Sequence, residues 1–308
     1  MNTAFAQVCT CLCLSVLMHA GCREARPPVE AEVKTAGTGM ILVDSDQRSV
    51  HLQGPTQRVL SLAPVASELM AHIGATDLLV GRTENCNFPP EISAIPSIGR
   101  LFPPNYEKIT ATRPHIILMA SGQLEVRKRL KAMGLVVFVV QPANIGEIGT
   151  MLITLGKMTG RTRQALQQAD LFNQRHTSIV SKVPVHRPRV FWEIWAKPLQ
   201  TVGPKGFIGD LIRQAGGKNI ITENEDPWPR VSNEYVVSKN PQVVIASNQS
   251  SRSAMLKKTR TGWDQTDAIR NQRIFLPPNM DTVTRPGPRI LDGLEWLISV
   301  LHPTQAGD

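Results

Sequence analysis

Few side chains of this 308-residue chain have the types and spacing that catalysis or metal binding requires. The seven histidines are dispersed, and no two of them stand at the spacing of paired metal ligands. The segment 203–206, Gly-Pro-Lys-Gly, lacks the flanking pattern of a phosphate-binding loop. Ser61 and Ser67 lack a nucleophile-elbow motif, and Cys86 has no histidine near it in the sequence. These patterns disfavour an enzyme.

Aromatic side chains in predicted loops are better candidates, because flat rings bind broad, largely apolar ligands. Trp228 lies between two prolines in a predicted loop, where burial in a core is the less favoured interpretation. Trp195 follows a predicted strand, and Phe88 and Phe102 lie in predicted loops nearer the N-terminus. Trp263 stays open. Two further tryptophans are interpreted as core residues: Trp192 and Trp296.

One long helix is predicted in the middle of the chain. Residues 161–183 contain neither glycine nor proline, and the run ends before Pro184, which disfavours helix at the preceding residue. A helix of this length spans roughly 30–35 Å. It predicts a stiff connector between two lobes, with an ordinary surface helix packed on one domain as the alternative. Its apolar face is predicted from three- and four-residue spacings: Leu166, Ala169, Phe172, Ile179 and Val183.

Short apolar strands alternate with helices on both sides of this connector. After a hairpin at 40–52, the predicted strands are 58–63, 78–81, 116–119, 136–140, 189–194, 243–246 and 274–276. The predicted helices are 67–73, 105–110, 124–133, 145–158, 207–214, 233–238, 263–269 and 289–301. This alternation predicts parallel sheets covered on both faces, whose ligands bind beyond the carboxyl ends of the strands. Five segments are therefore expected around a cleft: 63–65, 83–88, 120–121, 195–198 and 277–285.

The N-terminus predicts an exported protein. Residues 8–20 are mostly apolar but too few to span a bilayer, which takes roughly 20 residues, so they indicate a secretory signal. The ending Ala-Gly-Cys at 20–22 resembles a bacterial lipoprotein signal, in which the Cys22 thiol receives the lipid. A plain secretory signal or a misplaced start codon is the alternative, since His19 and the lack of a preceding basic residue depart from the pattern. We expect a lipid anchor in a bacterial membrane, with the protein facing the periplasm or the extracellular side.

The predicted division of the chain follows from these segments. It comprises a signal at 1–22, a tether at 23–39, an N-terminal lobe at 40–158, a backbone helix at 159–184 and a C-terminal lobe at 185–308. After removal of the signal only Cys86 remains, which excludes an internal disulfide. The formal net charge is +9, but the basic residues are scattered and lack interleaved aromatics. Solvated helix faces beside an anionic membrane therefore explain the charge better than nucleic acid does.

Several motifs, in this order, resemble a known family. They are 58–64 with Ser67-Glu68, 105–109 with 113–117, 206–212 with 215–219, 226–234, and 285–289 with 292–295. From residue 40 to the end, the set resembles the cobalamin and iron-siderophore receptors of ABC importers, which are periplasmic binding proteins built on a helical backbone. The most specific segment is Pro-Trp-Pro-Arg-Val-Ser-Asn-Glu at 227–234, which is similar to that of the cobalamin receptors.

The resemblance implies a fold and a function. The fold is the class III arrangement of α/β type, in which two Rossmann-like lobes with parallel sheets are joined by one long backbone helix and the ligand lies between the lobes. The function is non-catalytic capture of cobalamin or a related corrinoid, with delivery to a permease and its ATPase. It implies no cofactor and no metal site. A ferric siderophore or haem is the alternative ligand.

The expected cleft segments and the resemblance together give the predicted ligand-binding residues, which are Pro64, Val65, Asn85, Phe88, Phe102, Trp195, Trp228, Asp281 and Arg285. This chain departs from the cobalamin receptors in the first lobe. Asn85 stands where they have a tyrosine, and Leu101 or Phe102 and Ala120 stand where they have tryptophans. We therefore expect a less aromatic first-lobe wall. An anionic ferric siderophore would instead need cations, for which the candidates are Arg82, Arg100, Lys197 and Arg285.

Two acidic residues occupy matching positions in the two lobes. In the family, one glutamate on the outer surface of each lobe docks on basic residues of the permease, and the resemblance assigns these roles to Glu107 and Glu234. Exposed carboxylates of this kind steer association through electrostatic complementarity. The alternative is that both are ordinary acids of a first helical turn, favoured there by the helix dipole.

Overall fold

The computed structural model describes residues 34–36 and 39–303, so the predicted signal and the lipidation site Cys22 lie outside the described residues. The first described element is a three-stranded antiparallel sheet of β1 (Lys34–Ala36), β2 (Gly39–Val43) and β3 (Ser49–Leu52). The hairpin at 40–52 is confirmed. Residues 34–36, expected in the tether, instead pair with β2, because their backbone groups complete its free edge.

The N-terminal lobe is built on a four-stranded parallel sheet in the order β5-β4-β6-β7. Its strands are β4 (Val59–Ser61), β5 (Leu79–Arg82), β6 (Ile116–Met119) and β7 (Val137–Val139). Helices α1 (Pro64–His72) and α4 (Glu147–Thr159) bury apolar residues with one face of the sheet. Helices α2 (Tyr106–Ala111) and α3 (Leu124–Ala132) bury theirs with the other. Short 3-10 turns, η1 (Thr76–Leu78) and η2 (Pro90–Ala94), flank β5.

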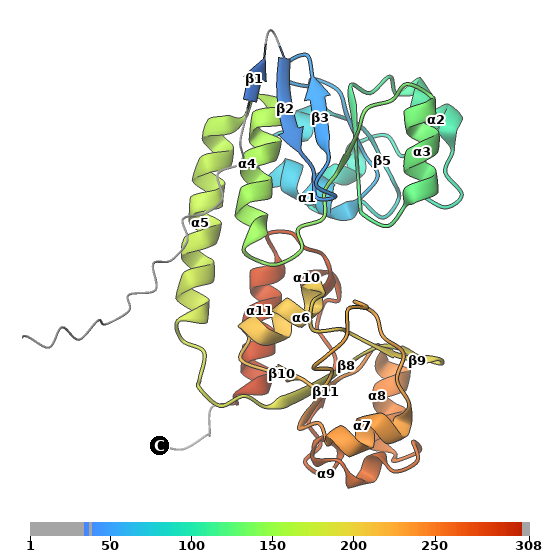
Figure 1. Cartoon of the computed structure of the whole chain (residues 1–308), viewed down its shortest axis with the longest axis vertical. Helices are drawn as coiled ribbons and strands as arrows, with labels where there is room; N and C mark the ends of the chain where they lie inside the picture. The colour runs from blue at the N-terminus through green and yellow to red at the C-terminus, as the bar shows by residue number, and fades with distance from the viewer. Residues whose placement is uncertain (1–33, 37–38, 304–308) are drawn as a thin grey trace, which may run out of the picture. The chain divides into compact units, whose positions relative to one another are not determined.

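The predicted long helix is α5 (Thr162–Val180), which packs along α4 and also contacts α11 of the second lobe (Figure 1). Contacts with both lobes identify it as the connector rather than a surface helix of one domain. The predicted apolar face was wrong at two positions, since Leu166 is 46% exposed whereas Ala165 is fully buried, and Val183 lies beyond the end of the helix. Gly156 of α4 leaves room for Ala165 there, because an added Cβ on that glycine would lie 2.2 Å from the Ala165 methyl group.

The C-terminal lobe repeats the design around β8 (Arg189–Ala196). Its parallel strands run in the order β10-β8-β11-β12, with β9 (Leu199–Thr201) added antiparallel to β8. The remaining strands are β10 (Lys218–Asn219), β11 (Val243–Ile245) and β12 (Ile274–Phe275). The helices are α6 (Phe207–Gln214), α7 (Asn233–Lys239), α8 (Gln249–Leu256), α9 (Asp267–Arg270), α10 (Asp281–Thr284) and α11 (Ile290–Leu301), with the 3-10 turn η3 (Trp263–Gln265).

The two faces of this second sheet bury different partners. Val190 and Trp192 pack with α6 and α11 in a core that continues through α5 to α1 and α4. Phe191 packs on the opposite face with α7, α8 and α9. Trp263 is fully buried there, edge-on to Phe191 with ring centroids 5.5 Å apart. Trp192 is confirmed as a core residue, and Trp263 proves to be one as well, while Trp296 is partly buried against the first core.

Candidate functional site

Two exposed indoles form the aromatic surface of the C-terminal lobe. Trp195 lies near the end of β8 and pairs across the β8–β9 hairpin with Gln200. Gln200 in turn bridges to Arg230, and its Nε2 donates to the Trp228 carbonyl oxygen at 2.8 Å. The exposed fractions are 61% for Trp195 and 42% for Trp228. One hairpin residue therefore links the two segments that carry exposed tryptophans.

Backbone hydrogen bonds fix the loop that carries Trp228. The Trp228 amide donates to Asp226 Oδ1 at 2.8 Å, and the Gly203 amide donates to the Pro227 carbonyl oxygen at 2.9 Å. A Cβ on Gly203 would stand 2.2 Å from the Asp226 carbonyl oxygen, so only glycine permits this approach. Trp195 is oriented separately, because its Nε1 donates to the Lys197 carbonyl oxygen at 2.8 Å. Hydrogen bonds to the backbone thus position the segments of both rings.

The N-terminal lobe offers less aromatic surface. Phe102 is 59% exposed and Asn85 is exposed as well. Phe88 is half-buried, since the guanidinium carbon of Arg289 lies 3.6 Å from its ring centroid. Pro64 is the first residue of α1 and is half-buried, whereas Val65 is 4% exposed and belongs to the core. The Val65 side chain therefore presents almost no surface to a ligand.

The sequence analysis placed Asp281 and Arg285 on a loop around the cleft, and the structure corrects this. Asp281 begins α10, and its carboxylate pairs with Arg285 at 2.9 Å. Arg285 also donates to Glu68 Oε1 at 2.9 Å and to Asn87 Oδ1 at 3.0 Å, and its side chain is only 15% exposed. The protein itself therefore uses the hydrogen-bonding capacity of Arg285.

The other candidate cations are also engaged. Arg82 donates to the carbonyl oxygens of Ile95, Thr83 and Ser93 at 3.1, 3.2 and 3.0 Å. Arg100 pairs with Glu84 at 3.5 Å on the surface. Within residues 34–36 and 39–303, Lys197 is the one of the four candidates with no ion pair or side-chain hydrogen bond. Three of the four candidate cations are thus engaged by oxygen atoms of the protein.

A buried carboxylate that the sequence analysis did not single out supports the end of β8. Glu193 is fully buried and pairs with Arg260, while Ser247 Oγ donates to its Oε1 at 2.6 Å and Ser251 Oγ makes a further short hydrogen bond. Burial alone would raise the pKa of Glu193, but the hydrogen bonds from Arg260 and the two serines outweigh it, and the pKa is lowered. The ionised group fixes β8 to α8 two residues before Trp195.

The two expected docking acids occupy equivalent positions. Glu107 and Glu234 are each the second residue of a helix, and both are exposed. The preceding cap is the same kind of interaction, since Asn105 Oδ1 accepts from the Lys108 amide at 2.9 Å and Ser232 Oγ accepts from the Tyr235 amide at 3.2 Å. A hydrogen bond with Ser232, joined by one from its own backbone amide, lowers the pKa of Glu234.

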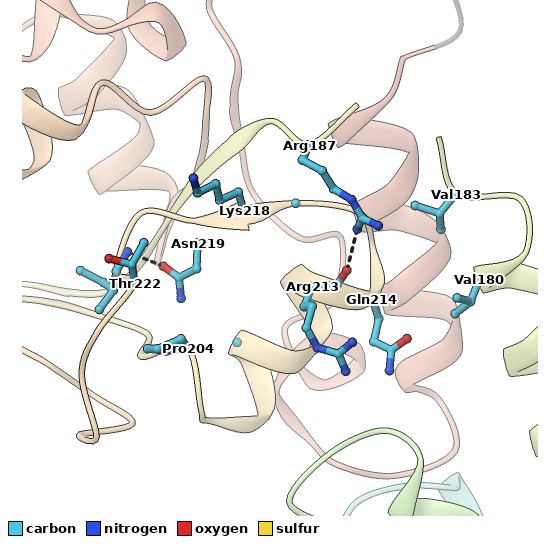
Figure 2. A pocket seen from close by; sticks show the side chains of 12 residues that line it. Val180, Val183, Arg187, Pro204, Arg213, Gln214, Lys218, Asn219 and Thr222 are labelled. Atoms are coloured by element: carbon cyan, nitrogen blue, oxygen red, sulfur yellow. Dashed lines mark hydrogen bonds between the residues drawn. The ribbon is translucent and has the colours of Figure 1, made fainter. Parts of the chain in front are cut away.

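Two larger pockets lie on the C-terminal lobe. One has a volume of about 540 Å³ and lies where α5 ends against α6 and β10 (Figure 2). Arg187, Arg213 and Lys218 surround it, and Arg187 Nη1 donates to the Arg213 carbonyl oxygen at 3.3 Å. The other has a volume of about 840 Å³ and includes Glu234 and residues 196–199. Neither of these two pockets is lined by Trp195 or Trp228.

Among residues 34–36 and 39–303, no group of three or more His, Cys, Asp or Glu side chains is placed to hold a metal ion. No helix formed by these residues has both the length and the apolar character needed to cross a bilayer. Cys86 is a free, buried cysteine, with its sulfur 3.2 Å from Thr83 Oγ1 and 3.8 Å from Ser61 Oγ.

Residues 59–279 match the family described as "Periplasmic binding protein". The chain belongs to this family. An uncharacterized ABC transporter substrate-binding lipoprotein of Bacillus subtilis, YvrC, is 26% identical over 97% of both chains. The match extends over more than half of the chain and confirms the resemblance inferred from the ordered motifs.

Solved structures of periplasmic binding proteins share the fold. The periplasmic vitamin B12 binding protein BtuF of Vibrio cholerae matches with a TM-score of 0.73 and 26% identity, over 82% of this chain and 99% of that one. A possible iron-binding protein from Staphylococcus epidermidis matches with a TM-score of 0.72 and 28% identity, over 80% and 99%. The class III architecture is thereby confirmed. The chain is a substrate-binding protein of ABC transporters, and members of its family are receptors rather than enzymes.

Two residues that organise this region were not predicted as functional. Glu68 and Arg289 form a buried ion pair between the lobes, with an N···O distance of 2.6 Å. The sequence does contain one signal, because Glu68 interrupts an apolar run between Ala66 and Met70. A carboxylate on the buried face of a helix requires a charged or hydrogen-bonding partner. Sequence alone does not reveal that the partner comes from the other lobe.

Proposed function

We propose that this substrate-binding protein captures cobalamin or a related corrinoid and delivers it to the permease and ATPase of an ABC importer. The observation that carries the proposal is the pair of exposed indoles, Trp195 and Trp228, on linked segments of the C-terminal lobe. A corrin ring is broad, largely apolar and fringed by amides. Stacking on fixed aromatic rings suits such a ligand.

The charges near the candidate surface favour this ligand over an anionic siderophore. Arg82 and Arg285 are committed to protein oxygens, and Arg100 is paired with Glu84. A siderophore bound through these three arginines would compete with those interactions, whereas a corrinoid needs only apolar contact and a few amide partners. The likeness to the vitamin B12 binding protein of Vibrio cholerae supports the same choice, while the likeness to the possible iron-binding protein keeps the siderophore as the second candidate.

A titration of the full chain tests the proposal. We would measure the quenching of tryptophan fluorescence by cyanocobalamin, cobinamide, haem and a ferric hydroxamate siderophore. The expected result is saturable binding of the two corrinoids and weak or no binding of the other two. Clear binding of the siderophore without binding of either corrinoid would replace the proposed ligand by the alternative.

Export and lipid anchoring at Cys22 are part of the same proposal. The small-small-Cys ending of the apolar segment and the description of YvrC as a lipoprotein support them. Cys22→Ala should release the protein into the soluble fraction or leave the precursor uncleaved. Unchanged processing and membrane association of this variant would contradict lipidation.

A further inference from the structure

A buried ion-pair network joins α1 of the N-terminal lobe to the segment before α11 of the C-terminal lobe. Glu68 on α1 is 4% exposed. Arg289 donates from Nε to Oε2 at 3.1 Å and from Nη2 to Oε1 at 2.6 Å, and Arg285 donates from Nη1 to Oε1 at 2.9 Å. The two-pronged contact of Arg289 is the strong geometry for an arginine–carboxylate pair. We call these three residues the Glu68 clasp.

The same two arginines also reach the N-terminal loop that contains two candidate site residues. Arg285 Nη1 donates to Asn87 Oδ1 at 3.0 Å, and the guanidinium of Arg289 covers the ring of Phe88. Loop 85–88 is therefore attached to the C-terminal lobe through side chains that Glu68 orients. This arrangement withdraws Phe88 from the surface offered to a ligand and leaves Asn85 exposed.

The clasp is enclosed and balanced in charge. The side chains of Arg285 and Arg289 are 15% and 16% exposed, and Asp281 supplies a second carboxylate to Arg285. The segment 285–289 lies directly against α1, because a Cβ added to Gly287 would stand 3.3 Å from Glu68 Oε2. Separation of the lobes at this point would leave partly buried charges without partners, which is strongly unfavourable.

We propose that Glu68 is a positioning residue that holds the two lobes at one fixed separation and keeps loop 85–88 in place for ligand binding. Helix α5 joins the lobes covalently, and the clasp adds a non-covalent connection to the shared core and to the buried hydrogen bond from the Ile145 amide to Asp210 Oδ2 at 3.0 Å. Without the clasp, the binding-competent arrangement is only fractionally populated, and the apparent affinity falls by that fraction. The ligand readout of this inference rests on the proposed corrinoid function, whereas its structural readout does not.

Hydrogen exchange of the full chain, followed by mass spectrometry, tests the structural part. Glu68→Gln preserves the side-chain volume and removes the charge. We expect amides in α1, in loop 85–88 and in the segment 285–289 to exchange together, about tenfold faster or more. The matched control is Arg175→Gln, which removes exposed pairs of Arg175 with Asp292 and Glu295 on α11, each 2.7 Å long. This control should leave the exchange rates of the three segments unchanged.

Binding kinetics with cyanocobalamin test the functional part. Glu68→Gln should weaken the affinity about fivefold or more, and Arg289→Lys should have an intermediate effect, because it keeps the charge but loses the fork and the ring contact. If Glu68→Gln does not fold, Arg289→Lys should still show faster exchange in all three segments, at smaller amplitude.

Two results would overturn the inference. One is faster exchange confined to α1, which would reduce Glu68 to a local stabiliser of that helix. The other is the same response in Arg175→Gln, which would show that any loosened ion pair on the C-terminal lobe has this effect. A wild-type protein that does not bind cyanocobalamin would refute the proposed ligand, while the exchange pattern would still decide whether the clasp acts between the lobes.

Discussion

The two lobes differ in the aromatic surface that each can offer to a ligand. The C-terminal lobe exposes Trp195 and Trp228 on two segments that a hydrogen bond from Gln200 links. The N-terminal lobe exposes Phe102, while Phe88 is covered by Arg289. The lobes share one sheet architecture, so this difference arises in the loops after the strands rather than in the scaffold. We infer that the C-terminal lobe contributes more of the binding energy.

Each lobe has one helix that begins with a side-chain cap followed by an exposed glutamate, and in this feature the lobes are alike. Glu107 follows an asparagine cap at the start of α2, and Glu234 follows a serine cap at the start of α7. The docking hypothesis for these two acids therefore predicts that both lobes contribute to docking on the permease. The predictions below test this likeness first and then the difference in the aromatic surfaces.

The largest effect is expected from reversing both acids. Glu107→Lys combined with Glu234→Lys should abolish transport, because the docking hypothesis pairs these acids with basic residues of the permease and the reversal would place like charges together. Ligand affinity should be unchanged, and each single reversal should slow association with the permease, most clearly at low salt. The measurement is uptake of labelled ligand by cells. Glu125→Lys, an exposed acid of the first turn of α3, is the control, and normal uptake by the double variant would contradict docking.

The aromatic surface of the C-terminal lobe should show the next largest effect. Trp228→Ala should weaken ligand binding by roughly 1–3 kcal/mol with little change in melting temperature, since the ring is exposed and contributes little to the core. Trp195→Ala should behave in the same way. Trp263→Ala is the contrast, because removing a fully buried indole costs about 3–5 kcal/mol of stability. A sharply lower melting temperature with unchanged affinity in Trp228→Ala would remove this residue from the site.

The N-terminal wall should contribute less. Phe102→Ala should weaken binding by about 1 kcal/mol or less, measured in the same titration, because a single exposed phenyl ring buries less area than two indoles. Phe102→Trp restores the ring type that the cobalamin receptors have in this region and should strengthen corrinoid binding. An effect of Phe102→Ala larger than that of Trp228→Ala would reverse the proposed ranking of the two lobes.

The smallest effect concerns the acid stability of the two lobes. Burial would raise the pKa values of Glu193 and Asp46, but hydrogen bonds and arginine charges lower both. Because a carboxylate is ordinarily half-protonated near pH about 4, their stabilisation is complete above that pH and is lost as the pH falls through the lower folded-state pKa values. Denaturant unfolding between pH 3 and 7 should therefore show stability falling at the acidic end.

Substitution by the neutral amide separates the two lobes in this experiment. Glu193→Gln should flatten the acidic decline more than Asp46→Asn, since the Glu193 side chain is fully buried whereas that of Asp46 is 24% exposed and partly screened by water. Equal slopes in the wild type and in Glu193→Gln would show that the ionised carboxylate of Glu193 does not stabilise the fold.

Most helices and strands could be predicted because their signals are local. The strand at 116–119 and the helix at 207–214 have the predicted bounds, because an apolar run defines the first and flanking glycines define the second. The face of α5 was predicted one residue out of place, at Leu166 instead of Ala165. Periodicity allows both, and only the close approach of Gly156 on α4 selects the smaller side chain.

Elements with weak local signals were not predicted. The strand β9 has three residues and exists because it pairs with β8, and α8 is a polar helix that covers Glu193. Asp281 and Arg285 were placed on a loop with free side chains, yet α10 and the clasp engage both. Their partners are distant in sequence, so no local pattern could reveal these interactions.

The sequence by itself determined the alternation of short strands and helices, the long helix between them, the family, and which tryptophan lies in an exposed loop, whereas the contacts of α5 with both lobes came from the tertiary structure. These properties follow from hydrophobic periodicity, from proline and glycine positions, and from motifs that recur in register. The tertiary structure alone decided which charged side chains remain available to a ligand. Glu68 and Arg289 are 221 residues apart in sequence but 2.6 Å apart in space. Whether a charge serves the fold or a ligand depends on such pairings, because a buried ion is stable only beside its partner.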